Sequence, residues 1–268
     1  LIDSTIDRSF ANGDVSATVS SSLPPGSSSG VAAGGLVAVM ESGSAIRGSY
    51  ATGAVSGLSV TATDAVAGGL LGVMTGGTVL NAYATGAVSN AASSAGAYAG
   101  GLAGLVLDGS IGNAYATGGV SGAAVKGGLV GGVDALDPAL PPSITASFWL
   151  DDGSGTDNGL GTRLTLAQFQ DLSTFADAGW DIDDAGGTGK AWRIYEGHTG
   201  PLLRSFLQSV TLTADASQSK IYGNTDPTLT YSVEAIGTNR GLVGSDIFSG
   251  ALARAAGEDV GTSYAINQ

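Results

Sequence analysis

Apolar positions repeat along the first part of the chain. A β-branched aliphatic residue stands four positions before an aromatic one in five places: Ile6 and Phe10, Ile46 and Tyr50, Val79 and Tyr83, Ile111 and Tyr115, and Ile144 and Phe148. Gly-Gly-Leu follows the first four pairs, beginning at Gly34, Gly68, Gly100 and Gly127. Self-similarity with a period of roughly 20 to 50 residues is typical of stacked units that bury their apolar faces against one another. The pattern predicts a solenoid over residues 1–150.

The residue types of the repeat favour strands over helices. Gly, Thr, Ser and Val recur every few positions and interrupt any run of helix formers. A coil of about 32 residues can hold three short strands, and stacking at roughly 4.8 Å places equivalent side chains in register. We therefore expect one ladder of aromatic residues and a second of Ile and Val.

The orientation of the aromatic ladder has two interpretations. Strict alternation along a strand places Ile111, Asn113 and Tyr115 on one face, without deciding whether that face is core or solvent. An exposed ladder could stack on sugar rings, whereas a buried one is packing. Because Phe replaces Tyr at both ends of the column, we favour core packing.

The corners of the coils differ in how much length variation they tolerate. Thr-Gly after the aromatics and Gly-Gly before each Leu indicate corners with positive φ or close backbone approach. The segment between each Thr-Gly-x-Val and the next Gly-Gly varies in length, and the longest example runs from Ser16 to Ala33. Variable loops on one edge of a rigid scaffold are where binding usually occurs.

The repeated sequence Tyr-Ala-Thr-Gly-x-Val-Ser, followed by Gly-Gly-Leu, closely resembles the GLUG repeat of filamentous-haemagglutinin-like and other large bacterial surface proteins. The resemblance covers residues 1–150 and is weakest in the first copy, which reads Phe10-Ala11-Asn12-Gly13. It implies an extracellular right-handed parallel β-helix at the bacterial cell surface, exported as part of an adhesin-like protein through an outer-membrane partner. It implies no catalytic site.

Residues 151–207 resemble the segment that often closes such arrays. Thr165-Leu166-Ala167-Gln168 reads as a capping box, and apolar residues three apart follow it, so we expect a short helix within residues 163–178. A cap protects the open strand edges of a solenoid from aggregation. We expect it to plug the last coil with all three tryptophans: Trp149, Trp180 and Trp192.

Residues 208–268 carry a second resemblance. Lys220-x-Tyr222-Gly223, Asp226-Pro227, Gly250-x-Leu252-x-Arg254 and Gly257-Glu258 look like the MBG or YDG-type modules that recur in stalks of bacterial surface proteins. The resemblance implies the start of a β-sandwich or β-grasp-like module. Because such modules usually continue for further strands, we expect this one to be partial and the chain to belong to a longer protein.

The composition of the chain limits the classes of partner that it can bind. Acids outnumber bases 23 to 10, which gives a net charge of −13 and disfavours nucleic acid and anionic membranes. The chain has no cysteine, so disulfides and thiolate metal sites are excluded. The most apolar run, Gly30 to Met40, is far shorter than the roughly 20 residues of a spanning helix, and we expect no membrane insertion.

Two acidic stretches could hold calcium, which prefers several oxygen ligands. Neither has the spacing of an EF-hand or of a calcium-binding β-roll, so solvated turns are the favoured interpretation and we expect no cofactor. The candidate ligands are Asp151, Asp152, Asp157, Asp181, Asp183 and Asp184.

Other chemical motifs are weak. His198 is the only histidine and has no nucleophile constellation around it, so a turn position is favoured over catalysis. The phosphate-loop-like stretch at Gly186 to Lys190 departs from the Walker pattern at Asp184 and Ala191.

These observations favour a non-catalytic scaffold or adhesin that displays variable loops to a host-surface or matrix glycan or protein. A binding-module alternative places a specific receptor site on the loop from Ser16 to Ala33. A further alternative is a carbohydrate-binding or polysaccharide-degrading β-helix, in which changing Asp151 or Asp181 should abolish turnover. The acids of the coils share no repeat position that would stack them into a paired carboxylate site, so we expect no enzyme.

Overall fold

The computed structural model describes residues 1–19, 30–59, 64–92, 94, 96–139, 141–185, 188–207, 210–216, 218–233, 250–261 and 263–267. The chain divides into two compact units, Leu1–Phe206 and Leu207–Gln268, and each is described by itself.

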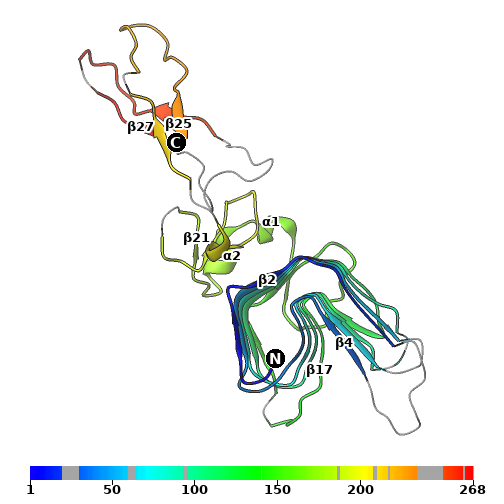
Figure 1. Ribbon diagram of the computed structural model, residues 1–268. Coiled ribbons are helices and arrows are strands. Elements are labelled where there is room, and N and C mark those ends of the chain that lie inside the picture. Colours follow the sequence, from blue (N-terminus) through cyan, green and yellow to red (C-terminus); the bar gives the residue numbers. More distant parts are fainter. Residues whose placement is uncertain are drawn as a thin grey trace, which may run out of the picture. The chain divides into compact units, whose positions relative to one another are not determined.

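Unit 1 is built on four parallel sheets, which we name A to D (Figure 1). Each of the first four coils contributes to every sheet, and a partial fifth coil extends sheet A alone. The all-β parallel solenoid predicted from the repeat is confirmed. The coils differ from the expectation of three strands each, because every Gly-Gly-Leu bends the chain between a strand of sheet C and a strand of sheet D.

The strands fall into the sheets as follows. Sheet A holds β1 (Thr5–Asp7), β2 (Phe10–Ala11), β6 (Ala45–Ala51), β10 (Thr78–Ala84), β14 (Ser110–Ala116), β18 (Ser143–Thr145), β19 (Phe148–Leu150) and β20 (Thr162–Leu164). Sheet B holds β3 (Val15–Val19), β7 (Val55–Ser59), β11 (Val88–Asn90) and β15 (Val120–Gly122). Sheet C holds β4 (Val31–Gly34), β8 (Ala65–Gly68), β12 (Tyr98–Gly100) and β16 (Val125–Gly127). Sheet D holds β5 (Val37–Met40), β9 (Leu71–Met74), β13 (Ala103–Val106) and β17 (Val130–Val133).

Equivalent residues of successive coils pair with one another. Tyr83 pairs with Tyr50 on one side and with Tyr115 on the other. The column is completed by Phe10 beside Tyr50 and Phe148 beside Tyr115. The two ladders predicted from the spacing, aromatic and aliphatic, are confirmed.

A column of left-handed residues interrupts sheet A. Asn81 has a φ of 53°, and each equivalent residue has a φ between 44° and 53°: Arg8, Gly48, Asn113 and Ala146. In the third coil, Val79 and Ala82 therefore point into the interior core, whereas Tyr83 lies outside it. The expectation that Ile111, Asn113 and Tyr115 share a face is wrong, because a left-handed residue reverses the alternation of the strand.

The interior of the coils has two compartments. One is filled by the Leu of each Gly-Gly-Leu, the Ile and Val ladder, and Met40 and Met74. The other lies between sheets B and C and holds only small residues, such as Ala67 and Val88. The bulkier compartment is closed at the fifth coil by Trp149, which is buried.

The glycines at the corners are required for close approach. A Cβ on Gly35 would lie 2.2 Å from the carbonyl oxygen of Gly69, and one on Gly86 would lie 1.9 Å from that of Gly53. Neither Gly35 nor Gly86 has a positive φ. Of the two reasons expected for these glycines, close contact with the neighbouring coil is the one that applies.

After the fifth coil, residues 164–206 form a segment that we name the strap. The predicted helix is present as two short helices, and the predicted capping box is confirmed, with Thr165 and Gln168 bonded reciprocally. The elements are α1 (Leu166–Phe169), α2 (Leu172–Ala176), β21 (Ile182–Asp183), β22 (Trp192–Arg193), β23 (Leu202–Leu203) and the 3₁₀ helix η1 (Arg204–Phe206).

The described residues of unit 2 form two antiparallel strand pairs. The first pairs β24 (Leu212–Ala214) with β25 (Tyr231–Val233), and the second pairs β26 (Ala253–Arg254) with β27 (Ile266–Asn267). None of the helices in the described part of the chain is long and apolar enough to cross a membrane.

Candidate functional site

The aromatic ladder lies on the outer surface of sheet A. Neighbouring rings are nearly parallel, with centroids 5.3 Å apart for Phe10 and Tyr50, 4.8 Å for Tyr50 and Tyr83, and 4.9 Å for Tyr83 and Tyr115. Phe10 is 54% exposed, whereas Tyr115 is 4% exposed and Phe148 is 6% exposed. The ladder is therefore covered progressively from the first coil to the fifth.

The strap covers the ladder. Phe206 packs edge-on against Phe10 and Tyr50. Trp192 lies against Tyr83 and Tyr115, with centroids 6.2 Å and 5.9 Å away. At the other end, Phe175 and Trp180 pack against Phe148. The strap thus follows the ladder back from the fifth coil to the first.

This arrangement corrects two expectations. The ladder is packed rather than open, but it is buried from outside by the strap and does not belong to the interior core. Trp149 plugs the last coil as expected, but Trp180 and Trp192 lie on the ladder instead.

Polar groups fix the strap on the ladder. Trp192 Nε1 donates to Asn81 Oδ1 at 3.0 Å, and Trp180 Nε1 donates to the carbonyl of Ala146 at 2.8 Å. Both acceptors belong to the left-handed column. The expected alternation of side chains along the strand gave no sign of this role. The hydroxyl of Tyr115 donates to the carbonyl of Pro201 at 2.8 Å. Burial raises the pKa of Tyr115 well above its ordinary value, so this phenol stays neutral.

The acidic calcium candidates do not come together. Asp151 forms an ion pair with Arg163, and Asp183 forms one with Arg204. Asp181 lies 2.9 Å from Lys190. Hydrogen bonds from Arg163 and from Lys190 lower the pKa of Asp151 and of Asp181.

The other three candidates occupy turns. Asp152 accepts from the hydroxyl of Ser154, Asp157 accepts from the amide of Gly159, and Asp184 is exposed. Within the described ranges, no group of three or more His, Asp or Glu side chains is placed to hold a metal ion. His198 is exposed in a turn, as its sequence context indicates, and Gly186 and Gly187 lie outside the described residues.

The edge between sheets B and C carries the variable connections. They comprise residues 20–30, 60–64, 91–97 and 123–124, whereas the corner between sheets C and D is always two residues: 35–36, 69–70, 101–102 and 128–129. Asn90 anchors one connection, because its buried carboxamide donates to the carbonyls of Ala65 and Tyr98 at 2.7 Å and 2.9 Å. The loop predicted from Ser16 to Ala33 is on this edge, and its residues 20–29 lie outside the described part.

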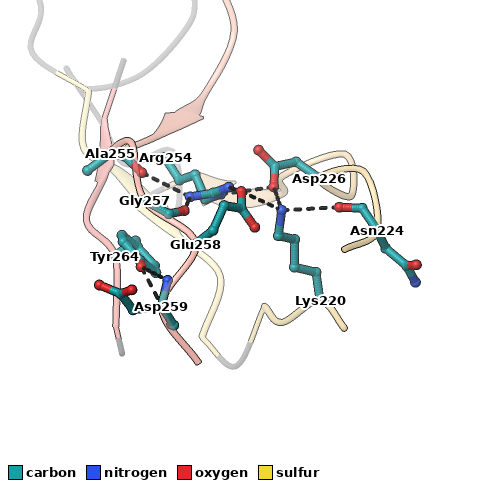
Figure 2. Close-up of polar contacts among 9 residues, drawn as sticks. All are labelled: Lys220, Asn224, Asp226, Arg254, Ala255, Gly257, Glu258, Asp259 and Tyr264. Atoms are coloured by element: carbon teal, nitrogen blue, oxygen red, sulfur yellow. Dashed lines mark hydrogen bonds and ion pairs between the residues drawn. The ribbon is translucent and has the colours of Figure 1, made fainter. Parts of the chain in front are cut away.

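Unit 2 contains a cluster of four charged side chains, shown in Figure 2. Lys220 Nζ lies 2.9 Å from Asp226 and 3.0 Å from Glu258. Arg254 contacts both carboxylates and places its guanidinium 5.1 Å from the centre of the Tyr264 ring. Two cations thus face two carboxylates, and the cluster joins residues 220–226 to residues 254–258.

A cavity of about 560 Å³ lies beside the charged cluster, and its walls include Tyr222, Leu229 and Ile266. Both cations on its wall are already matched by carboxylates, so the cavity offers no unpaired positive charge to an anionic ligand.

The charge states of these side chains favour ion pairs over a covalent amide cross-link. An amide between Lys220 and Asp226 would require a neutral amine and a protonated carboxyl. Hydrogen bonding to Asp226 raises the pKa of Lys220, and the same contact lowers the pKa of Asp226. Both groups therefore stay charged.

Comparison with known proteins agrees with part of this picture. Residues 210–268 match the family model described as "MBG domain (YGX type)", as the charged motifs of unit 2 predicted. The chain is also 34% identical, over 149 residues, to a "Putative Gly-rich membrane protein" of Evansella cellulosilytica. That stretch is 55% of this chain but 13% of the relative, so the chain spans about an eighth of its length. No solved structure matches the chain.

The fold and the family match together define a parallel β-solenoid followed by an MBG-type module of the kind found in surface proteins. The GLUG identification of the coils, the handedness of the solenoid and the adhesin assignment stay predictions.

Proposed function

We propose that this chain is a non-catalytic scaffold segment of a bacterial cell-surface protein, which binds a host-surface or matrix glycan or protein through its sheet B–C edge. The observation that carries the proposal is the contrast between corners. The connections from sheet A to sheet B and from sheet C to sheet D keep one length in all four coils. The connection from sheet D to sheet A lengthens only before the partial fifth coil, at residues 134–142, whereas the one between sheets B and C differs in every coil. Variation concentrated on one edge is typical of a binding surface on a rigid support.

The covered ladder supports the scaffold part of the proposal. Stacked rings contribute about 0.5–1.5 kcal/mol per pair beyond their buried area. The strap adds hydrogen bonds to coils that are distant from it in sequence, such as the one from Trp192 to Asn81. Sheet A is held by the interior core on one side and by the strap on the other, and this support keeps the B–C edge in place. Weak contacts of several loops with a repetitive partner would then add up to a higher total affinity.

The placement of the carboxylates supports the non-catalytic part. A glycosidase needs two carboxylates about 5 to 9.5 Å apart and free to exchange protons. Asp151 and Asp181 are each held by a basic side chain, which keeps them ionised.

The proposal is tested by exchanging one loop. Residues 20–30 are replaced by the short connection of residues 123–124, and both chains are tested on glycan arrays and immobilised matrix proteins. A matched control carries Tyr195→Ala, which alters an exposed residue of the strap. We expect the loop-exchanged chain to lose at least tenfold in affinity without a change in melting temperature, and the control to bind normally.

Absence of binding, or binding that survives the exchange, overturns the proposal. So does release of reducing ends from a polysaccharide that is lost in Asp151→Asn or Asp181→Asn, since that outcome assigns the chain to the enzymatic alternative.

A further inference from the structure

A small cavity lies between the strap and the left-handed column of sheet A. Its volume is about 250 Å³, and its walls include Gly48 and Asn81 from the column and Leu203 from the strap. In the third coil, Asn81 reaches Trp192 of the strap with its side chain. Gly48, the equivalent residue of the second coil, has no side chain to reach the strap. We name the space that remains the strap cavity.

The strap cavity is basic, although the chain has a net charge of −13. Its walls carry three of the ten basic residues of the chain: Arg8, Lys190 and Arg204. No Asp or Glu is among the described residues that line it. A basic pocket on an acidic molecule favours a small anion, because a long polyanion would also meet the surrounding negative charge.

The three cations retain unused hydrogen-bond donors. Lys190 Nζ and Arg8 Nε each contact one carboxylate at 2.9 Å. Two donors of Lys190 and both terminal nitrogens of Arg8 have no partner among the described residues. Nε of Arg204 is buried and also lacks a partner there. A buried unpaired donor costs about 1–3 kcal/mol, so this arrangement indicates a site that a further acceptor completes.

The cavity of unit 2 differs in this respect. Two carboxylates, those of Asp226 and Glu258, form part of its wall. Lys220 Nζ contacts both of them and also donates to the carbonyl of Asn224 at 3.1 Å, so its donors are already used. Of these two cavities, only the strap cavity combines cations with unused donors.

Neutral groups in the wall match a sugar ring. Asn81 Oδ1 accepts from the indole of Trp192, which leaves the Nδ2 of Asn81 as a donor, and Ser205 adds a hydroxyl. Ala191 and Leu203 supply apolar surface beside these polar groups. The volume is below the roughly 300–1,000 Å³ of sites for drug-sized ligands, so the cavity suits one small ring.

We propose that the strap cavity binds an acidic monosaccharide through its carboxylate. Arg8, Lys190 and Arg204 hold the carboxylate, Asn81 and Ser205 bind ring hydroxyls, and Leu203 contacts the C–H face of the ring. The inference does not depend on the proposed function, because none of these residues belongs to the sheet B–C edge.

Calorimetric titration of the whole chain tests the proposal. The probes are glucuronate, glucose as its neutral counterpart, and inorganic phosphate as a free oxyanion. We expect glucuronate to bind at least tenfold more tightly than glucose and to lose affinity as salt is added. Absence of glucuronate binding overturns the proposal. Binding of phosphate without glucuronate also overturns it, in favour of a site for a free anion.

The decisive variant is Gly48→Asn, which fills the strap cavity. Asn occupies the same left-handed backbone at Asn81 and Asn113, with φ of 53° and 49°. A Cβ on Gly48 would lie 3.5 Å from Cγ of Arg8, an ordinary contact. We therefore expect an unchanged melting temperature and at least a tenfold loss of affinity for glucuronate.

A second variant locates the site without altering the backbone. Lys190→Met removes a half-exposed cation of the wall and should weaken glucuronate binding at least fivefold. Lys126→Met, in β16 and away from the cavity wall, is the control and should bind normally. Exchange of residues 20–30 should also leave glucuronate binding intact, which separates this site from the proposed function. Binding that survives both Gly48→Asn and Lys190→Met overturns the proposal.

Discussion

The two units are stabilised by different kinds of contact. In unit 1, the strap and the ladder bury aromatic rings and connect neutral polar groups, such as the indole of Trp192 and the carboxamide of Asn81. In unit 2, the side-chain contacts that join residues 220–226 to residues 254–258 include ion pairs with half-exposed carboxylates, such as that of Lys220 with Glu258. Buried apolar area stabilises strongly, whereas ion pairs open to water contribute little.

The difference predicts which conditions should destabilise each unit. The repeated coils are locked by contacts that salt does not screen, and the module is held by contacts that salt does screen. Salt and acid should therefore weaken unit 2 more than unit 1, whereas alkaline pH should weaken unit 1.

The largest effect is expected at Trp192. This side chain is fully buried between the ladder and Trp180, and Trp192→Ala should reduce the free energy of unfolding by about 3–5 kcal/mol. Urea denaturation of the whole chain measures the loss. Tyr195→Ala, at an exposed position close by in the strap, is the control and should cost far less. Equal losses would mean that the strap does not hold the ladder.

Alkaline pH should act on the ladder next. Burial raises the pKa of Tyr83 and Tyr115, so the folded state holds their protons more tightly than the unfolded state, in which tyrosine titrates at about 10. Their contribution to stability is complete below that pH and is lost as the pH rises towards the raised values.

Denaturation curves from pH 8 to 12, with tyrosinate absorbance as a second signal, measure this effect. Unfolded chain in urea supplies the reference titration. If all tyrosines ionised near their ordinary pKa while the coils stayed folded, the ladder would have to be open to water.

A smaller effect is expected at the start of α1. Thr165 accepts from the amide of Gln168, and the Gln168 side chain accepts from the amide of Thr165. Thr165→Ala should cost about 1 kcal/mol, seen as faster amide exchange in α1. Thr165→Ser keeps the hydroxyl and should behave like the original chain. An equal effect of the two substitutions would rule out the hydroxyl as the cause.

The smallest effect is expected in unit 2. Lys220→Met should lower the stability of the module less than Thr165→Ala affects α1, because both carboxylates that Lys220 faces are about half exposed to water. Added salt should erase the difference. Melting of the module at low and high salt measures this. Lys126→Met, which removes a lysine from β16 in unit 1, is the control. A large, salt-independent loss would show that the charged cluster is a buried core element after all.

The same cluster sets an acid limit. Hydrogen bonds from Lys220 and Arg254 lower the pKa of Asp226 and Glu258. Their contribution is present above the ordinary values, about 3.9 and 4.3, and is lost as the pH falls through the lowered ones. Acid should therefore loosen unit 2 at a pH at which the ladder phenols are unaffected.

Much of the solenoid could be predicted from the sequence because its contacts repeat. Spacing alone identifies which residues stack, since Tyr50, Tyr83 and Tyr115 recur at the period of the coil. The capping box at Thr165 is equally local. Such features depend on neighbours in the chain or on a fixed period, and both can be found by inspection.

The missed features depend on contacts with no period. The left-handed column could have been suspected from Gly48, Asn81 and Asn113, which belong to the residue types that tolerate positive φ, but Arg8 and Ala146 obscure the signal. The path of the strap depends on pairs such as Trp192 with Asn81, separated by 111 residues. The concentration of tryptophan after residue 148 indicated a cap but not the surface it covers.

The fixed length of the strap also matches the number of coils that it covers. It begins beside the fifth coil, where Phe175 meets Phe148, and ends at the first, where Phe206 meets Phe10 and Tyr50. Each coil adds roughly 4.8 Å to the wall, and the strap has a fixed number of residues. Removing an internal coil would leave Phe206 without its rings, whereas coils added beyond Phe10 would pass uncovered. The length of the strap therefore decides how many coils it can seal.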